Sequence, residues 1–305
     1  MSEPLNLRID ASTRYCAVFG FPIRHSASPA MQNAGIEAIG LPWRYLAFEV
    51  RPSQLKEALA GAKAMRFLGV NLTVPHKLLA MELVDELDAS ARTWGAVNTV
   101  RLEARGTDGQ WKPLREFVET PEQVRMQGFN TDADALSRSI REDLGMNPSG
   151  ATVLVLGAGG AGRTAALKLA SEGPAALHLV NRTREKAASV ANEIASRYPK
   201  VKVTLDFPAG NCDLVINATS LGLKPADPLP VQDSQFDLRR TGCVYDMIYR
   251  PAETPFLQKA KSRGCRVANG LGMLLYQGAA ALELWSGQSA PIEIMREALR
   301  KHVYG

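Results

Sequence analysis

The feature that most constrains the fold is a glycine-rich segment between a buried strand and a helix. The strand pattern ATVLVLG, residues 151–157, is continuously apolar, as in a strand covered on both faces of a parallel sheet. A helical pattern, RTAALKLASEG, follows at residues 163–173. The segment between them fits the spacing Gly-x-Gly-x-x-Gly and reads Gly157, Ala158, Gly159, Gly160, Ala161 and Gly162. This order predicts a Rossmann-like, doubly wound α/β domain.

In a dinucleotide-binding turn of this spacing, each glycine has its own role. The first allows the tight bend, the second lets a pyrophosphate approach the backbone, and the third lets the helix pack on the strand. The N–H groups at the start of the helix then face the phosphates. A glycine-rich turn without a ligand is the simpler alternative, but its place between strand and helix favours a dinucleotide site.

Further apolar runs extend the sheet of this domain, and helical patterns fill most of the gaps between them. The runs are residues 177–181, 201–205, 212–219, 242–248 and 265–269. The first part of the chain also alternates strand-like and helical runs, the order of an α/β fold. These runs are 14–20, 28–40, 44–50, 52–65, 67–74, the amphipathic stretch 76–93 and 96–103.

Three segments link or complete these two parts. Residues 101–127 carry an Asp-Gly pair suited to a tight turn and are expected to form an extended hairpin or insertion. Residues 128–145 show a helical pattern that stops near Gly145. Residues 270–287 are apolar around most of a helix and are expected to be buried. We predict one α/β domain at 1–131, with 271–305 packing back on it, and a second at 132–270.

The segment after the second strand of the glycine-rich domain indicates which dinucleotide binds. An NAD site places Asp or Glu there for the ribose hydroxyl, whereas an NADP site offers arginine to the 2′-phosphate. The chain instead carries polar and basic residues at this place: Asn181, Arg182, Thr183, Arg184 and Lys186. The prediction is NADP, with Arg184 as a possible solvated surface charge.

Composition restricts the partners. The net charge of +5 suits small anions, but the basic residues are scattered, so no nucleic-acid partner is expected. No apolar run reaches the length of a membrane span, and the first ten residues lack a leader pattern, so we expect a cytoplasmic protein. The four cysteines are widely spaced, which predicts reduced thiols and no metal site.

Several blocks of the sequence resemble one family. Residues 20–29 read GFPIRHSASP, and residues 71–77 read NLTVPHK. The further blocks are GAVNT at 95–99, NTD at 130–132, NRT at 181–183, DMIY at 246–249 and GLGM from 270, with Gln277 beyond it. In this order they resemble the shikimate dehydrogenases over about residues 14–287.

The resemblance implies a two-domain enzyme that reduces 3-dehydroshikimate to shikimate with NADPH in an interdomain cleft. It makes residues 1–131 the substrate-binding domain and 132–270 the NADP-binding domain. It implies a catalytic pair of Lys77 and Asp132. Hydride transfer leaves negative charge on the ketone oxygen, which requires a proton donor or cation there. Lys77 either passes the proton or stabilises the charge, and the sequence leaves both open.

The resemblance also implies the ligand contacts. Substrate contacts are Ser26 and Ser28 at the carboxylate, with Thr73, Asn98, Tyr249 and Gln277 at the hydroxyls. Cofactor contacts beyond the turn and the segment 181–186 are Thr219, Met247 and Gly270. Each residue alone has a structural alternative, such as a cap for Asp132 or Ser28. A monomer or a homodimer is expected.

The chain departs from the family at a few positions. Ala133 and Ala135 stand where the family has glycines, Gln32 stands where it commonly has histidine, and residues 101–127 are longer than the usual connection. A quinate or aminoshikimate dehydrogenase on the same scaffold stays open as an alternative. A catalytically silent NADP-binding sensor is a second alternative, although the presence of Lys77 and Asp132 argues against it.

Overall fold

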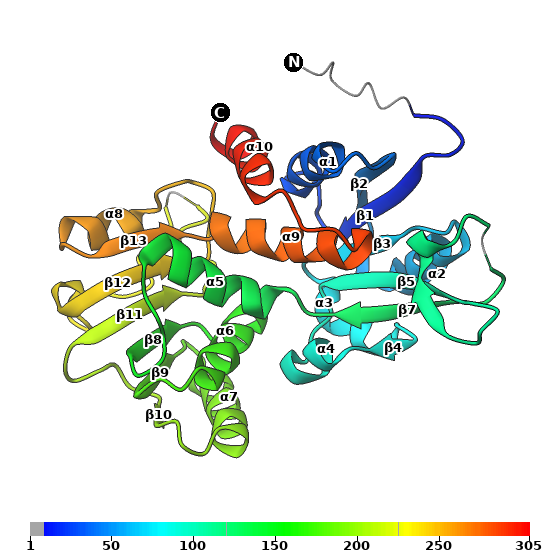
Figure 1. The fold of residues 1–305 in the computed structure, drawn as a ribbon. Coiled ribbons are helices and arrows are strands. Elements are labelled where there is room, and N and C mark those ends of the chain that lie inside the picture. Colours follow the sequence, from blue (N-terminus) through cyan, green and yellow to red (C-terminus); the bar gives the residue numbers. More distant parts are fainter. Residues whose placement is uncertain (1–8, 120, 225) are drawn as a thin grey trace. The chain divides into compact units, whose positions relative to one another are not determined.

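The computed structural model describes residues 9–119, 121–224 and 226–305, which divide into two compact units (Figure 1). Unit 1 runs to Asp132 and resumes at Leu275, and unit 2 is Ala133–Leu274. The boundaries therefore fall at the start of one helix and inside another. The expectation of no leader was based on the first ten residues. Of these, residues 1–8 lie outside the described residues.

A mixed sheet forms the centre of unit 1. Its strands, in order across the sheet, are β2 (Trp43–Glu49), β1 (Arg14–Gly20), β3 (Gly69–Leu72), β5 (Thr99–Arg105), β7 (Val124–Phe129) and β4 (Glu86–Leu87), with β6 (Trp111–Pro113) paired to β5. β1 is parallel to β2 and β3, whereas β5 is antiparallel to β3 and β7. The carboxyl ends of β1, β3 and β7 therefore meet the start of β5 at one edge of the sheet.

Helices flank this sheet and complete its core. They are α1 (Ser28–Ala38), α2 (Leu55–Ala64), α3 (His76–Leu79), α4 (Ala89–Trp94), the unit 1 part of α9 (Leu271–Ser286) and α10 (Ile292–Tyr304). Trp285 of α9 lies directly on β3, where a Cβ atom at Gly69 would fall 1.9 Å from its Nε1. Because Trp285 Nε1 also donates to Val100 O at 3.0 Å, α9 is fixed to two neighbouring strands.

A parallel sheet forms the centre of unit 2. Its strands, in order, are β10 (Val203–Thr204), β9 (Ala176–Val180), β8 (Thr152–Leu156), β11 (Cys212–Asn217), β12 (Thr241–Asp246) and β13 (Arg266–Asn269). The helices of this unit are α5 (Asp132–Leu144), α6 (Gly160–Ser171), α7 (Arg184–Arg197) and α8 (Pro255–Ser262). In chain order the strands lie 3-2-1-4-5-6, the arrangement of dinucleotide-binding sheets. The predicted doubly wound α/β fold is confirmed.

Short 3₁₀ turns connect some of these elements. They are η1 (Pro52–Gln54), η2 (Ala80–Glu82), η3 (Leu114–Glu116) and η4 (Leu238–Arg240). Among the described residues, no helix is both long and apolar enough to span a bilayer.

The amphipathic stretch at residues 76–93 is not one helix. It divides into α3, η2, the short strand β4 and α4. Asp88 starts α4 by accepting a hydrogen bond from Ser90 N at 2.8 Å, and β4 pairs with β7 just before it. The cap at Asp88 and the pairing of β4 with β7 therefore prevent this stretch from forming one continuous helix.

The linking segments behave as expected. An antiparallel hairpin joins β5 and β6 through a turn in which Gly109, after Asp108, has a φ of +76°. α5 ends at Leu144, and Gly145 follows with a φ of +59°, a conformation that favours glycine.

Candidate active site

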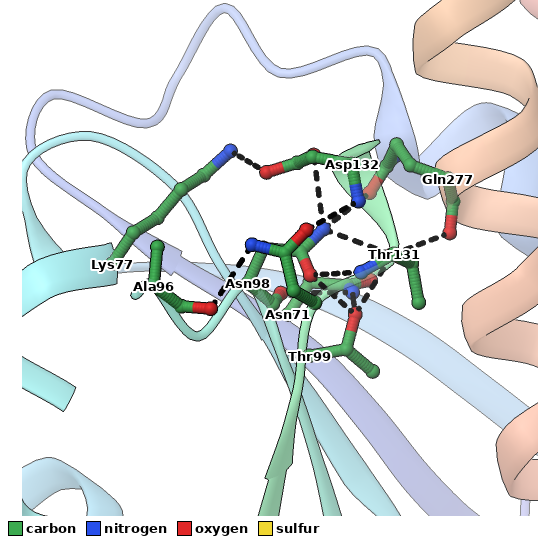
Figure 2. Close-up of polar contacts among 9 residues, drawn as sticks. Asn71, Lys77, Ala96, Asn98, Thr99, Thr131, Asp132 and Gln277 are labelled. Atoms are coloured by element: carbon green, nitrogen blue, oxygen red, sulfur yellow. Dashed lines mark hydrogen bonds and ion pairs between the residues drawn. The ribbon is translucent and has the colours of Figure 1, made fainter. Parts of the chain in front are cut away.

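A buried polar cluster lies at the sheet edge of unit 1 where β3, β5 and β7 meet. Figure 2 shows that it gathers side chains from segments far apart in the sequence. Asn71 comes from β3, and Thr99 begins β5 directly after Asn98. Thr131 lies between β7 and α5, and Asp132 is the first residue of α5. Antiparallel pairing of β5 with both neighbours brings these chain ends together.

An ion pair joins this cluster to α3. Lys77 Nζ lies 2.7 Å from Asp132 Oδ2, and their side chains are 32% and 11% exposed. Backbone and side-chain contacts hold the short helix that carries Lys77. The backbone carbonyl of Lys77 accepts a hydrogen bond from Val97 N at 2.9 Å. The buried His76 ring contacts Val50 O through Nε2 at 2.8 Å. Lys77 therefore presents a positioned and partly accessible ammonium group beside a carboxylate.

Asn98 orients the second oxygen of this carboxylate. Its Nδ2 donates to Asp132 Oδ1 at 3.0 Å and to Thr131 Oγ1 at 2.9 Å, while its Oδ1 accepts from Thr131 N at 2.8 Å. Gln277 of α9 completes the group, with its Oε1 3.4 Å from Asn98 Nδ2. The structure thus brings together Lys77, Asn98, Asp132 and Gln277.

The backbone that presents Asp132 is held separately. Asp132 N donates to Asn130 Oδ1 at 3.1 Å, and Asn130 Nδ2 donates to Ala96 O at 3.0 Å. Ser90 Oγ accepts from Asn130 N at 3.0 Å, which connects this turn to the cap of α4. The Asp132 carboxylate accepts hydrogen bonds from Lys77 and Asn98, so it does more than cap a helix.

Three predicted substrate contacts lie in segments that follow β1 and β3 of this sheet. Ser26 and Ser28 form the turn that starts α1, with Ser28 N donating to Ser26 Oγ at 3.3 Å. Thr73 directly follows β3 and packs on Gly20, where a Cβ atom would lie 2.5 Å from Thr73 Cγ2. All three belong to unit 1, with Thr73 on the same chain segment as Asn71 of the polar cluster.

Four further polar residues of this region were not among the predicted site residues: Asn71, Thr99, Asn130 and Thr131. Asn71 Nδ2 donates to Thr99 Oγ1 at 3.0 Å, and Thr99 Oγ1 lies 3.2 Å from Thr131 Oγ1. All four belong to blocks that carry the family resemblance. Membership in these blocks is the only signal that the sequence offers for them, whereas in the structure their burial requires hydrogen-bond partners.

The glycine-rich turn of unit 2 has the geometry of a phosphate-binding turn. Gly157 has a φ of +109°, and a Cβ atom on Gly162 would lie 2.2 Å from Gly157 O. A Cβ atom at Gly159 would instead meet nothing within 4 Å. The first and third glycines therefore close the turn, and the second leaves its outer side open to a ligand, as the spacing predicts.

Asn181 braces this turn from the end of β9. Its Oδ1 accepts from Ala158 N at 3.0 Å and its Nδ2 donates to Thr183 O at 2.8 Å. The side chains of Arg182, Thr183 and Lys186 are exposed at the start of α7. Arg184 is also exposed and pairs with Asp206, with 3.2 Å between Nη1 and Oδ1.

The remaining predicted contacts follow β11, β12 and β13. Thr219 donates to Asn217 Oδ1 at 2.7 Å, and Asn217 Nδ2 donates to the buried Asp246 at 3.0 Å. Gly270 packs against Met247, because a Cβ atom there would lie 2.2 Å from Met247 O. Two residues after Met247, Tyr249 is half-buried, and this burial raises the pKa of its phenol.

Parallel strands in this order, a glycine-rich turn and exposed cations after β9 define a dinucleotide-binding α/β protein. An ammonium and a carboxylate in unit 1 add the acid–base groups of a dehydrogenase.

Comparison with known proteins identifies the family. Residues 18–100 match the shikimate dehydrogenase substrate binding domain, residues 139–223 match the shikimate/quinate 5-dehydrogenase family, and residues 270–300 match the shikimate 5′-dehydrogenase C-terminal domain. The shikimate dehydrogenase (NADP(+)) of Desulforamulus reducens is 40% identical, over 97% of this chain and 98% of its own. The chain belongs to the shikimate dehydrogenase family.

Solved structures agree with this assignment. A shikimate dehydrogenase crystallised in complex with NADP+ is 34% identical with a TM-score of 0.84, covering 99% of this chain and 100% of its own. The Thermus thermophilus enzyme, solved in complex with NADP(H) and shikimate, is also 34% identical, with a TM-score of 0.78 and coverage of 95% and 99%.

Proposed function

We propose that this chain catalyses the reversible, NADPH-dependent reduction of 3-dehydroshikimate to shikimate. The observation that carries this proposal is the contact of 2.7 Å between Lys77 Nζ and Asp132 Oδ2 inside the polar cluster. Relatives over nearly the whole chain are shikimate dehydrogenases (NADP(+)), and a related structure holds NADP(H) and shikimate. The names of these relatives indicate the reaction, and the Lys77–Asp132 pair is suited to its proton transfer.

The side chains of unit 1 supply the proton and, together with Tyr249 of unit 2, hold the substrate hydroxyls. When bound, NADPH supplies the hydride for the ketone carbon. Lys77 donates a proton to the ketone oxygen as it becomes an alcohol, and Asp132 holds the ammonium and accepts a hydrogen bond from a neighbouring hydroxyl. Asn98 keeps the Asp132 carboxylate in place during this transfer, through its bond to Oδ1 at 3.0 Å.

Neutral hydrogen-bonding groups bind the rest of the substrate. Ser26 and Ser28 bind its carboxylate, which agrees with their place at the start of α1, where helix N–H groups attract anions. The hydroxyl contacts are Thr73, Asn98, Tyr249 and Gln277. Each can donate and accept, as ring hydroxyls require.

The residues of unit 2 fit NADP. The open side of Gly159 suits a pyrophosphate, and the exposed Arg182 and Lys186 suit a 2′-phosphate. The cofactor contacts are Gly157, Ala158, Gly159, Gly160, Ala161, Gly162, Asn181, Arg182, Thr183, Lys186, Thr219, Met247 and Gly270. On this basis residues 132–270 form the NADP-binding domain, and residues 1–131 with 271–305 form the substrate-binding domain.

An initial-rate assay tests the proposal directly. Shikimate, quinate and 3-dehydroshikimate are each supplied with NADP(H) and with NAD(H), and kcat/KM is compared. We expect the highest values for the shikimate pair with NADP(H). A preference for quinate would move the protein to the alternative reaction on the same scaffold, and no turnover with any pair would support a catalytically silent binding protein.

Cytoplasmic location and a monomeric or homodimeric state belong to the same proposal. The four cysteines are free and buried, which suits a reducing compartment. Light scattering on the purified chain measures the oligomeric state, and fractionation of the source cells measures the location.

A further inference from the structure

Tyr45 lies behind the polar cluster and is not among the expected substrate contacts. It is a fully buried residue of β2, and its ring packs against Trp285 with 6.1 Å between centroids. Its hydroxyl donates to Asn71 Oδ1 at 2.8 Å. Burial raises the pKa of Tyr45 well above its ordinary value, so the phenol keeps the proton that it donates to Asn71. The side chain of Ser28 also hydrogen-bonds this hydroxyl.

The Asn98 carbonyl and the Tyr45 hydroxyl together hold the orientation of the Asn71 amide. Because Tyr45 occupies Oδ1, the NH₂ end faces Thr99 Oγ1 at 3.0 Å and Asn98 O at 3.3 Å. A reversed amide would present its NH₂ group to the Tyr45 hydroxyl and its oxygen to Asn98 O, leaving two acceptors opposed. The Asn98 carbonyl therefore excludes the reversed amide, and the phenol supplies the donor that Asn71 Oδ1 needs in the observed orientation.

Further hydrogen bonds connect Asn71 to the residues around the ion pair. Thr99 Oγ1 accepts from Asn71, so its own proton is directed to Asn98 Oδ1 at 3.3 Å or Thr131 Oγ1 at 3.2 Å. Thr131 N also donates to Asn98 Oδ1 at 2.8 Å, so Thr99 and this backbone donor together hold the NH₂ end of Asn98 toward Asp132 Oδ1. These contacts lie within unit 1, and the side chains of Asn71, Asn98 and Thr99 are buried.

We propose that Tyr45 is a positioning residue for the Lys77–Asp132 pair and acts through the amide of Asn71. This inference rests on the proposed function for its kinetic consequence, while its structural consequence holds for any substrate. The hydroxyl carries the effect, because a phenylalanine would keep the ring in contact with Trp285 and remove only the donor. The buried Asn71 Oδ1 is then left without this donor, a cost that loosens the amide and its hydrogen bond to Thr99.

The kinetic test is Tyr45→Phe, assayed with shikimate and NADP+. We expect kcat to fall about tenfold through misorientation of the acid–base pair, while KM for NADP+ stays within about twofold. Tyr245→Phe is the matched control, because Tyr245 is equally buried and its hydroxyl bonds Ser139 in unit 2. Equal kcat losses in both variants would overturn the proposal, since they would reflect general loss of stability.

A double-mutant cycle separates positioning from packing. If Tyr45 acts through Asn71, adding Tyr45→Phe to Asn71→Ala should lower kcat by less than about twofold. Independent, multiplying losses would overturn the proposal. Thr99→Val breaks the next link without depending on the folding of the tyrosine variant, and it should reproduce the kcat loss; wild-type turnover in this variant would also overturn the proposal.

Side-chain amide exchange measured by NMR gives a readout that needs no substrate. In the wild-type protein the NH₂ protons of Asn71 and Asn98 should exchange slowly, and in Tyr45→Phe at least about tenfold faster. Unchanged exchange would overturn the positioning role even if the enzyme is active. If the wild-type protein turned over none of the tested substrates, the proposed function would fail, and the exchange rates would still decide the role of Tyr45.

Discussion

The proposed role of Lys77 as proton donor can be tested by a single substitution. Its ammonium group is held 2.7 Å from Asp132 and its side chain is 32% exposed, so it can reach a ligand without losing its partner. We expect Lys77→Ala to lower kcat by about 10²–10⁴, the usual contribution of a positioned acid or base. NADPH binding, measured by fluorescence titration, should change little.

A surface lysine provides the control for this substitution. Lys63 pairs with Asp85 at 2.9 Å on the surface of unit 1, so Lys63→Ala removes the same charge away from the polar cluster. Its kcat should match that of the wild-type protein. Near-normal turnover of Lys77→Ala would exclude Lys77 as the proton donor.

Arg182 tests the choice between the two nicotinamide dinucleotides. It is exposed directly after β9, and only NADPH offers a 2′-phosphate to its guanidinium. A charged hydrogen bond is worth about 1.5–3 kcal/mol, so Arg182→Ala should raise KM for NADPH about ten- to a hundredfold and leave KM for NADH nearly unchanged. Arg239→Ala, which removes an arginine paired with Asp237, is the control. Equal changes for both cofactors would show that Arg182 does not contact the phosphate.

At the scale of the element, the cap of α4 shows how a helix end supports the site. Burial raises the pKa of Asp88, but hydrogen bonds from the side chain and backbone of Ser90 outweigh it, so the pKa lies below its ordinary value. We expect Asp88→Ala to lower the free energy of unfolding by about 1 kcal/mol at neutral pH. Asp88→Asn, which keeps an acceptor oxygen, should lose less.

The pH dependence of this loss follows from the sign of the pKa shift. A carboxyl group with a depressed pKa in the folded state stabilises the protein above its unfolded pKa of about 3.9 and loses that effect as pH falls through the folded value. The difference between wild type and Asp88→Ala, measured by urea unfolding, should therefore shrink below about pH 4. A difference that is constant with pH would show that the charge of Asp88 contributes nothing.

α5 carries the two alanines that replace the family's glycines. Ala133 and Ala135 are buried, and among the described residues only Arg66 combines a side chain with a positive φ, so neither alanine is strained. Glycine in a helix costs roughly 0.5–1 kcal/mol relative to alanine, so Ala133→Gly with Ala135→Gly should lower the melting temperature and preserve activity. Ala60→Gly, at an exposed position of α2, measures the helix propensity alone. A higher melting temperature of the double variant would contradict the helical role of these residues.

At the scale of the whole molecule, local patterns predicted the fold better than the site. The strand of residues 151–157 and the turn after it determine their own structure, so the sheet of unit 2 could be predicted from the sequence. The partners of Asn71 and Thr99 depend instead on β3 and β7 lying on either side of β5, and pairing between distant segments leaves no local pattern. For the same reason the helical stretch at residues 76–93 gave no sign of β4, which forms only because β7 is beside it.

The assignment of one ligand to each unit is the last prediction, and hydrogen exchange measured by mass spectrometry tests it. NADP+ alone should slow exchange in the peptides that cover the glycine-rich turn and the start of α7, because backbone N–H groups there would bind phosphate oxygens. Shikimate alone should slow exchange at the start of β5 and in the turn after β7, where Asn98 and Asp132 lie. Lys77→Ala should weaken the second effect and leave the first unchanged. Protection by NADP+ centred on the sheet edge of unit 1 would reverse the assignment of the two domains.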